Sequence, residues 1–434
     1  MTAEIAVMNK QAVALAAESA VTYPDEKGQK IFSSANKIFA LSKHQPIGVM
    51  VYGNAEFMEV PWETIIKTYR LKLGRKAFGQ VQQYAEDFLR FLSRNSSLFP
   101  QPALDNHFRS KLYACFQSIR AAILEGIAKE REKQKKISLT AARKLADDEI
   151  LRHLDIYRKA PLGRSIPASH RSQLRKRYGK DMSRIQKAVF EKLPMSVSSQ
   201  RLLRTLGVDL FCKLPKEVTY TGMSGIVFAG FGRRQIFPVV TAYTLDGKVL
   251  NQILYRQDGV TSTGLQSGAA IVPFAQRDMV ATFMEGASPD YQNAILTDLH
   301  KLLGNLSEVI ISIVPGLSGK KKAEIVRRLA KAYPALLKEY RQGLDRYRRR
   351  EYVEPVIRVV EMLPKDELAA MAESLVNLTS FKKRMSMEAE TVGGPIDVAV
   401  ISKGDGLILV KRKHYFKQEL NPHFFRNYFE GDDR

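Results

Sequence analysis

Short apolar runs separated by polar turns occupy the first 53 residues of the chain. The run at 3–8 predicts a short strand, and the run at 12–17 consists of small apolar residues, a pattern typical of a strand buried on both faces. Residues 31–41 and 47–53 show a similar extended pattern beyond a polar turn. We therefore predict four strands in this part of the chain.

The period of the pattern changes near Trp62. Apolar residues then recur at steps of three and four, which predicts amphipathic helices as far as residue 193, with a break at 161–169. A second helical block is predicted over 289–314, 318–350, 353–361 and 364–379.

Runs typical of strands return between and after the helical blocks. They cover 224–231, 236–244, 249–255 and 266–275, and a final pair flanks the turn at 404–406. Asp246-Gly247 separates two alternating apolar runs, which is a strong signal for a tight hairpin turn. This order of elements predicts an α+β protein in which distant strand blocks share a core.

The same order divides the chain into five segments. Strand blocks are predicted at 1–61, 216–286 and 386–434, the last of them ending in an aromatic tail. Helical segments are predicted at 62–215 and 287–385.

Composition places the chain among soluble globular proteins. Of its 434 residues, 45% are apolar and 26% are charged. We find no uncharged apolar run of about 18 residues and no signal-peptide pattern, so we expect no membrane span and a cytoplasmic protein. Cys115 and Cys212 form no disulfide or metal-ligand pattern, and no phosphate-binding glycine loop of the G-x-x-x-x-G-K type is present.

The net charge of +23 is large and unevenly distributed. Residues 129–192 contain 19 Lys and Arg against 8 Asp and Glu, and residues 320–361 contain 13 against 6. Because both stretches are predicted helices, one interpretation is a set of solvated or internally packed helix faces. The other is a surface for nucleic acid or an acidic protein, which the tyrosines interleaved with arginines over 340–352 would suit.

A threonine follows the initiator methionine directly. Thr2 is small enough for methionine aminopeptidase to remove Met1, which would place a hydroxyl nucleophile and a free α-amine on one residue. Lys37 shares its alternation phase with Phe39 and Leu41, an unusual position for a lysine unless it is paired. Both features also have ordinary interpretations, as the second residue of a strand and as part of a structural ion pair.

Short motifs follow one another in a fixed order along the chain. They lie at Thr2, Ala17–Thr22, Asn36–Ile38, Gly53–Glu56, Ser224–Gly232, Gln266–Gly268 and Val392–Asp397. This ordered set resembles the β-subunits of the proteasome, and most closely their HslV-type bacterial homologue, which are N-terminal-nucleophile hydrolases. The resemblance covers about 1–60, 220–286 and 386–413, under half of the chain.

The resemblance implies a four-layer αββα sandwich in which the two helical segments are long insertions. It implies hydrolysis of peptide bonds in a peptide or protein substrate, without a cofactor. It further implies a homo-oligomer, an ATPase partner that controls access to the site, and no association with a membrane.

The functional residues of that family transfer to five positions of this sequence. Thr2 would be the nucleophile with its own amine as the base, and a charged Lys37 would favour the neutral amine. Glu18 would keep Lys37 charged. The backbone N–H of Gly53, otherwise a turn glycine, would donate to the oxyanion, and Ser267 would orient the amine or a water.

The sequence departs from the family pattern in two motifs. The aspartate after the second strand is Glu18 here, one methylene longer, and Ala389 and Val392 stand where the family has Asp-x-x-Ser. The alternative function is a catalytically silent relative whose basic helices bind nucleic acid or an acidic protein. That alternative predicts indifference to Thr2→Ala, whereas a hydrolase of this class would lose all turnover.

Overall fold

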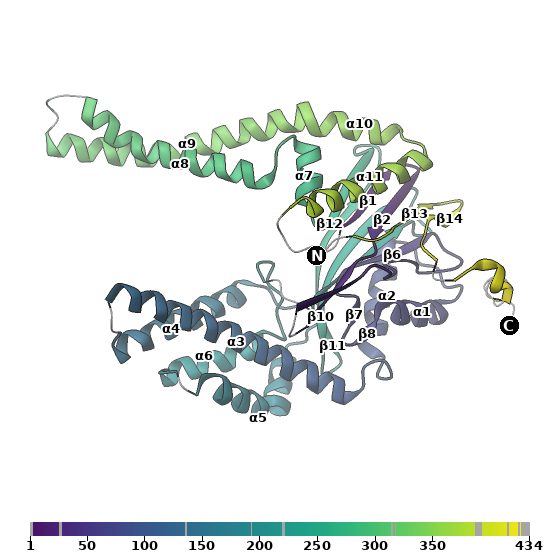
Figure 1. Ribbon diagram of the computed structural model, residues 1–434, viewed down its shortest axis with the longest axis horizontal. Coiled ribbons are helices and arrows are strands. Elements are labelled where there is room, and N and C mark those ends of the chain that lie inside the picture. The colour runs from purple at the N-terminus through teal and green to yellow at the C-terminus, as the bar shows by residue number, and fades with distance from the viewer. Residues whose placement is uncertain are drawn as a thin grey trace. The chain divides into compact units, whose positions relative to one another are not determined.

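The computed structural model describes residues 3–25, 28–134, 137–191, 193–218, 222–313, 316, 318–386, 393–414, 416–423 and 426. Over these residues the chain is an α+β protein with two antiparallel five-stranded sheets (Figure 1), which confirms the predicted class at that level. The chain divides into two compact units with one sheet each. Unit 1 comprises Met1–Ala35, Ser262–Ser402 and Ile408–Arg434, and unit 2 comprises Asn36–Thr261 and Lys403–Leu407.

The sheet of unit 1 joins strands from both ends of the sequence in the order β12-β1-β2-β13-β14. These strands are β1 (Ala3–Asn9), β2 (Ala12–Glu18), β12 (Ala269–Ala275), β13 (Ile396–Ser402) and β14 (Gly406–Lys411). Every residue of β1 and β2 is buried, including the polar Glu4, Asn9 and Glu18, and the small apolar run at 12–17 predicted this for β2. A separate hairpin pairs β3 (Val21–Asp25) with β4 (Gly28–Phe32).

Three helices of unit 1 share a core with one face of this sheet, namely α7 (Asp278–Glu285), α10 (Glu354–Met362) and α11 (Lys365–Arg384). Between α7 and α10 the chain forms α8 (Pro289–Ile313), α9 (Gly319–Arg348) and the π-helix η1 (Arg349–Val353). Alternate residues of β1 and β2, many of them alanines, share a core with Ala372 and Val376 of α11. The small strand side chains let the helix approach the sheet closely.

Within unit 1, α8 and α9 lie side by side as a helical hairpin (Figure 1). A hydrogen bond of 3.0 Å joins the hydroxyls of Ser307 and Tyr333 between them. A short 3-10 helix, η2 (Gln418–Leu420), lies near the C-terminus. The predicted segment 287–385 therefore contains both a helix packed on the sheet and this hairpin.

The sheet of unit 2 has the order β11-β10-β9-β6-β5. Its strands are β5 (Ile38–Ala40), β6 (Ile47–Gly53), β9 (Ser224–Gly230), β10 (Val239–Val249) and β11 (Gln252–Ser262), and β7 (Glu56–Phe57) pairs with β8 (Val60–Pro61). Helices α1 (Trp62–Leu73) and α2 (Val81–Arg94) share its aromatic core. The ring of Phe88 lies 5.0 Å from that of Tyr69 and 5.5 Å from that of Phe228.

The remaining helices of unit 2 have a core of their own. They are α3 (Gln101–Gln134), α4 (Leu139–Lys159), α5 (His170–Phe190) and α6 (Val197–Asp209). The ring of Phe108 stacks on Tyr178 at 4.0 Å and on Phe211 at 4.4 Å. The predicted segment 62–215 thus contains two helices that pack with the sheet and a helical bundle.

The prediction of a hairpin turn at Asp246-Gly247 is wrong. Both residues lie inside β10, and the chain turns at Leu250 and Asn251, whose φ angles of +49° and +61° are those of a tight hairpin turn. Asp246 is buried because it forms an ion pair with Lys111 of α3. Gly247 is required there by close packing, since a Cβ would lie 2.1 Å from Nε2 of His107.

Candidate active site

The carboxylate of Glu18 lies at the end of the unit 1 sheet where β1 begins. It is the last residue of β2 and is only 1% exposed. Its Oε1 accepts a hydrogen bond of 3.0 Å from the backbone N–H of Ala3, and its Oε2 accepts one of 3.2 Å from Ser380 of α11. Thr2 lies outside the described residues, but Ala3 follows it directly, so this buried carboxylate contacts the residue next to the candidate nucleophile.

The end of β12 lies at the same place, because β12 runs antiparallel to β1. Ala275, the last residue of β12, pairs with Ala3 and has a φ of +56°. Gln276 follows it and is 8% exposed. Gln276 could not be predicted from the sequence, because a glutamine after a strand carries no motif; the register of β1 with β12 singles it out.

The structure does not bring Ser267 to the start of β1. Ser267 is exposed and precedes Ala269, which pairs with Asn9 at the opposite end of β1. At about 3.4 Å per residue, the six steps between the Asn9 and Ala3 pairs correspond to roughly 20 Å. The motif match placed the serine before the strand, whereas antiparallel pairing brings the residues after that strand to Ala3.

Lys37 and Gly53 lie at one end of the unit 2 sheet. Lys37 immediately precedes β5 and is 5% exposed, and its backbone oxygen accepts a hydrogen bond of 2.9 Å from Val51 of β6. Gly53 ends β6 two residues later with a φ of +82°, a conformation that favours glycine. A Cβ on Gly53 would lie 2.8 Å from the backbone oxygen of Met223, so no other residue fits there without a shift.

The segment before the final strand pair is described only from Gly393 onward. Ala389 and Val392 lie outside the described residues. Gly394 has a φ of +82°, and the Oγ of Ser19 donates a hydrogen bond of 2.5 Å to the backbone oxygen of Pro395. This contact anchors the residue after Glu18 to the beginning of β13.

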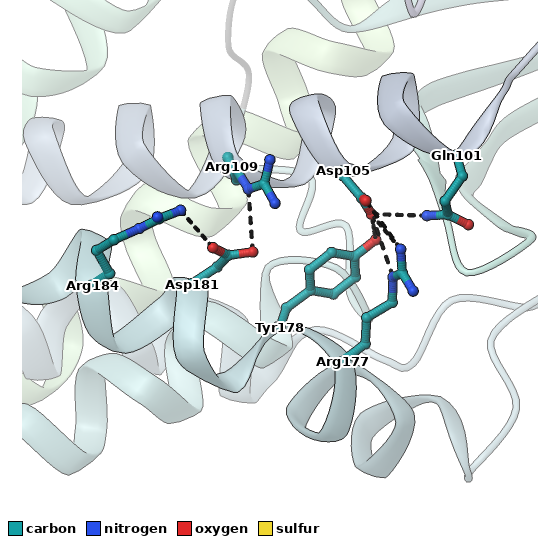
Figure 2. Close-up of polar contacts among 7 residues, drawn as sticks. All are labelled: Gln101, Asp105, Arg109, Arg177, Tyr178, Asp181 and Arg184. Carbon is teal, nitrogen blue, oxygen red and sulfur yellow. Dashed lines mark hydrogen bonds and ion pairs between the residues drawn. The ribbon is translucent and has the colours of Figure 1, made fainter.

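The arginines of the basic region in unit 2 are partly used within the protein (Figure 2). Arg177 of α5 donates to both carboxylate oxygens of Asp105 at 3.0 Å, and the hydroxyl of Tyr178 donates to the same carboxylate at 2.7 Å. Asp181 pairs with Arg109 at 3.2 Å and with Arg184 at 2.7 Å. These contacts join α3 to α5, as Figure 2 shows.

The surroundings of this network shift the pKa of two members. Burial alone would raise the pKa of Asp105, but hydrogen bonds from Tyr178, Gln101 and Arg177 outweigh it and lower that pKa. Burial and the hydrogen bond to Asp105 raise the pKa of Tyr178 to about 12. The network is therefore a structural contact between helices, and its arginines are not available as a continuous phosphate-binding surface.

No group of three or more His, Cys, Asp and Glu side chains in the described part of the chain could hold a metal ion. Within the same residues, no helix is long and apolar enough to cross a membrane. A scan against protein-family models and a search of curated proteins find no match for this chain.

Proposed function

We propose that the protein is an N-terminal-nucleophile hydrolase that cleaves peptide bonds with Thr2 after removal of Met1. The observation that carries the proposal is the buried carboxylate of Glu18, bonded at 3.0 Å to the backbone N–H of Ala3. A carboxylate costs free energy when it is buried, so its place beside the residue after Thr2 calls for a function. The resemblance supplies one, as part of a threonine-hydrolase site.

In the proposed reaction, the hydroxyl of Thr2 attacks the carbonyl carbon of a peptide bond while its proton passes to the α-amine. The unperturbed pKa of such an amine is about 7.7–8.0, which suits a base that works near neutral pH. The protonated amine then gives the proton to the nitrogen of the scissile bond as the C–N bond breaks. The peptide amine departs, and the acyl group remains as an ester on Thr2. Water hydrolyses that ester with the same amine as its base, so no cofactor is consumed.

Two further residues have local properties that suit the roles given by the resemblance. Lys37 is a buried lysine, and an ammonium near the amine would favour the neutral, proton-accepting form. Gly53 has no side chain that could block the approach of a substrate to its backbone N–H. Both residues belong to unit 2, whereas Glu18 belongs to unit 1.

The proposal includes the four-layer αββα sandwich that the resemblance implies. Within unit 1, α11 shares a core with one alternating set of residues from β1 and β2. A cytoplasmic homo-oligomer with an ATPase partner remains part of the proposal.

Incubation with a peptide epoxyketone, followed by mass spectrometry, tests the proposed nucleophile. This warhead closes its ring only with a hydroxyl and a free α-amine on one residue. We expect loss of Met1 and an adduct on Thr2 in the native chain, and neither an adduct nor peptide cleavage in Thr2→Ala. A chain that has lost Met1 but forms no adduct, or a Thr2→Ala variant that still cleaves peptides, would contradict the proposal.

A second candidate function is binding of nucleic acid by α9, and it rests on the charges of that helix. Its cations include Lys320, Lys321, Lys322, Arg327, Lys331, Lys338, Arg341 and Arg346, which are exposed and form no ion pair with the residues that the structure describes. This distinguishes α9 from the arginines of α5 in Figure 2. Unneutralised cations along one helix are what a phosphate backbone would contact.

Salt dependence of DNA binding tests this candidate. If α9 contacts phosphates, replacing Lys320, Lys321 and Lys322 with glutamine should reduce the slope of log K against log salt concentration by about 2–3. A matched variant, with the paired Arg109, Arg177 and Arg184 of Figure 2 replaced by glutamine, carries the same change in net charge and should keep the slope. Equal slopes in both variants would show that binding reflects only the net charge of the chain.

A further inference from the structure

Gln276 lies at the same end of the unit 1 sheet as Ala3 and Glu18. Ala275 pairs with Ala3, so Gln276 directly follows one member of this pair in the sequence and Thr2 directly precedes the other. The side chain of Gln276 is 8% exposed, although the residue lies between a strand and the start of α7. A long polar side chain is thus buried at the point where β1 begins.

The carboxamide of Gln276 does not use its hydrogen-bonding capacity. Neither its oxygen nor its nitrogen has a hydrogen-bond partner within the described ranges of the chain. Burying a donor and an acceptor without partners is unfavourable, so such groups are rare in native proteins and call for an explanation. The explanation we consider is a partner that forms only when Met1 has been removed.

Processing would create such a partner at the neighbouring position. While Met1 is attached, the nitrogen of Thr2 is a planar amide with one N–H. Removal of Met1 converts it into an amine with at least two N–H donors and freedom to rotate about the N–Cα bond. An acceptor fixed by burial would remove that freedom, and orientation of a catalytic group is worth a large factor in rate.

We propose that Gln276 is a positioning residue whose carboxamide oxygen accepts a hydrogen bond from the α-amine of processed Thr2. This inference rests on the proposed function. The hydrogen bond holds the amine so that its lone pair faces the Thr2 hydroxyl, the proton of which it must accept. Gln276 thereby supplies the orienting group that Ser267 cannot supply from the opposite end of β1.

Two substitutions of Gln276 separate this role from a structural one. Gln276→Met keeps the length of the side chain without an acceptor oxygen, whereas Gln276→Glu keeps an acceptor at the same place. The measurements are the rate of epoxyketone adduct formation on Thr2, kcat and KM for a fluorogenic peptide, intact mass to confirm loss of Met1, and the midpoint of thermal unfolding.

We expect Gln276→Met to lower the labelling rate and kcat by about 10²-fold with little change in KM, because the amine is still present but no longer held. The same variant should unfold within about 2 °C of the native chain, because loss of the hydrogen bond to the amine is offset by removal of the buried amide nitrogen, which has no partner. Gln276→Glu should keep more of the labelling rate than Gln276→Met and should approach the native rate as the pH rises, because a carboxylate keeps the acceptor but favours the protonated amine. A purely structural role predicts the reverse for Gln276→Met, a lower unfolding midpoint with an unchanged rate per folded molecule.

Native labelling rates in Gln276→Met would overturn the inference and leave the proposed function intact. Equal losses in Gln276→Met and Gln276→Glu would also overturn it, because a retained acceptor would then have no effect. If the unsubstituted chain loses Met1 but forms no adduct, the proposed function fails and this role of Gln276 fails with it.

Discussion

Glu18→Gln is expected to lower kcat for peptide cleavage by about 10²–10⁴-fold while the fold stays intact. The substitution removes the negative charge but keeps the shape of the side chain. An amide oxygen can still accept the hydrogen bond from Ala3, and the hydroxyl of Ser380 can accept from the new amide nitrogen as well as donate. A lower kcat would therefore be due to the missing negative charge. Steady-state kinetics with a fluorogenic peptide would measure it.

Ser380→Ala is the matched control for this variant. It removes one partner of the Glu18 carboxylate without changing any charge. We expect a loss of about 1 kcal/mol in the free energy of unfolding and a much smaller effect on kcat. If Glu18→Gln kept the full kcat, the carboxylate would be a structural anchor for the start of β1 and would have no electrostatic role in catalysis.

Lys111→Met should destabilise unit 2 by about 3–5 kcal/mol. The Lys111 side chain is 7% exposed, its Nζ pairs with the carboxylate of Asp246, and it also donates a hydrogen bond of 3.1 Å to the backbone oxygen of Leu210. The substitution leaves a buried carboxylate in β10 without its lysine. Chemical denaturation followed by circular dichroism would measure the loss as a lower midpoint.

Two controls separate the buried charge from the loss of a side chain. Lys301→Met breaks an ion pair with Asp298 whose partners are 69% and 72% exposed, and it should cost less than about 0.5 kcal/mol. Lys111→Met combined with Asp246→Leu removes both buried charges and should recover most of the lost stability. A Lys111→Met variant as stable as Lys301→Met would show that the buried pair contributes nothing.

The sequence pattern predicted the type of most elements because it depends on local periodicity. The alanine-rich strands β1 and β2 and the long amphipathic helices α3, α9 and α11 were expected near their observed positions. What the pattern could not predict was pairing between distant segments. Asp-Gly is a dipeptide typical of tight turns. Here Lys111 of α3 pairs with Asp246 and His107 of α3 packs against Gly247, and the dipeptide lies inside a strand.

The candidate site shows the same limit. Glu18 could be selected by its motif, and the structure shows it buried beside Ala3, while Lys37 and Gly53 lie at one end of the unit 2 sheet. Ser267 was selected by a Ser-Gly motif that does not depend on the direction of the strand. Gln276 became visible only through the register of β1 with β12 and through its unsatisfied amide.

Unit 1 is built from stretches that lie far apart in the sequence, and this affects the order of events during synthesis. Unit 2 is made almost entirely of Asn36–Thr261, whereas β1 and β2 need β12, which begins at Ala269, roughly 250 residues after Glu18. At about 5–20 residues per second, the ribosome needs roughly 12–50 s for that stretch. Throughout this interval β1 has no β12 to pair with. Under the proposed function, methionine aminopeptidase thus has a window of tens of seconds to reach Met1 before the sheet closes around the start of β1.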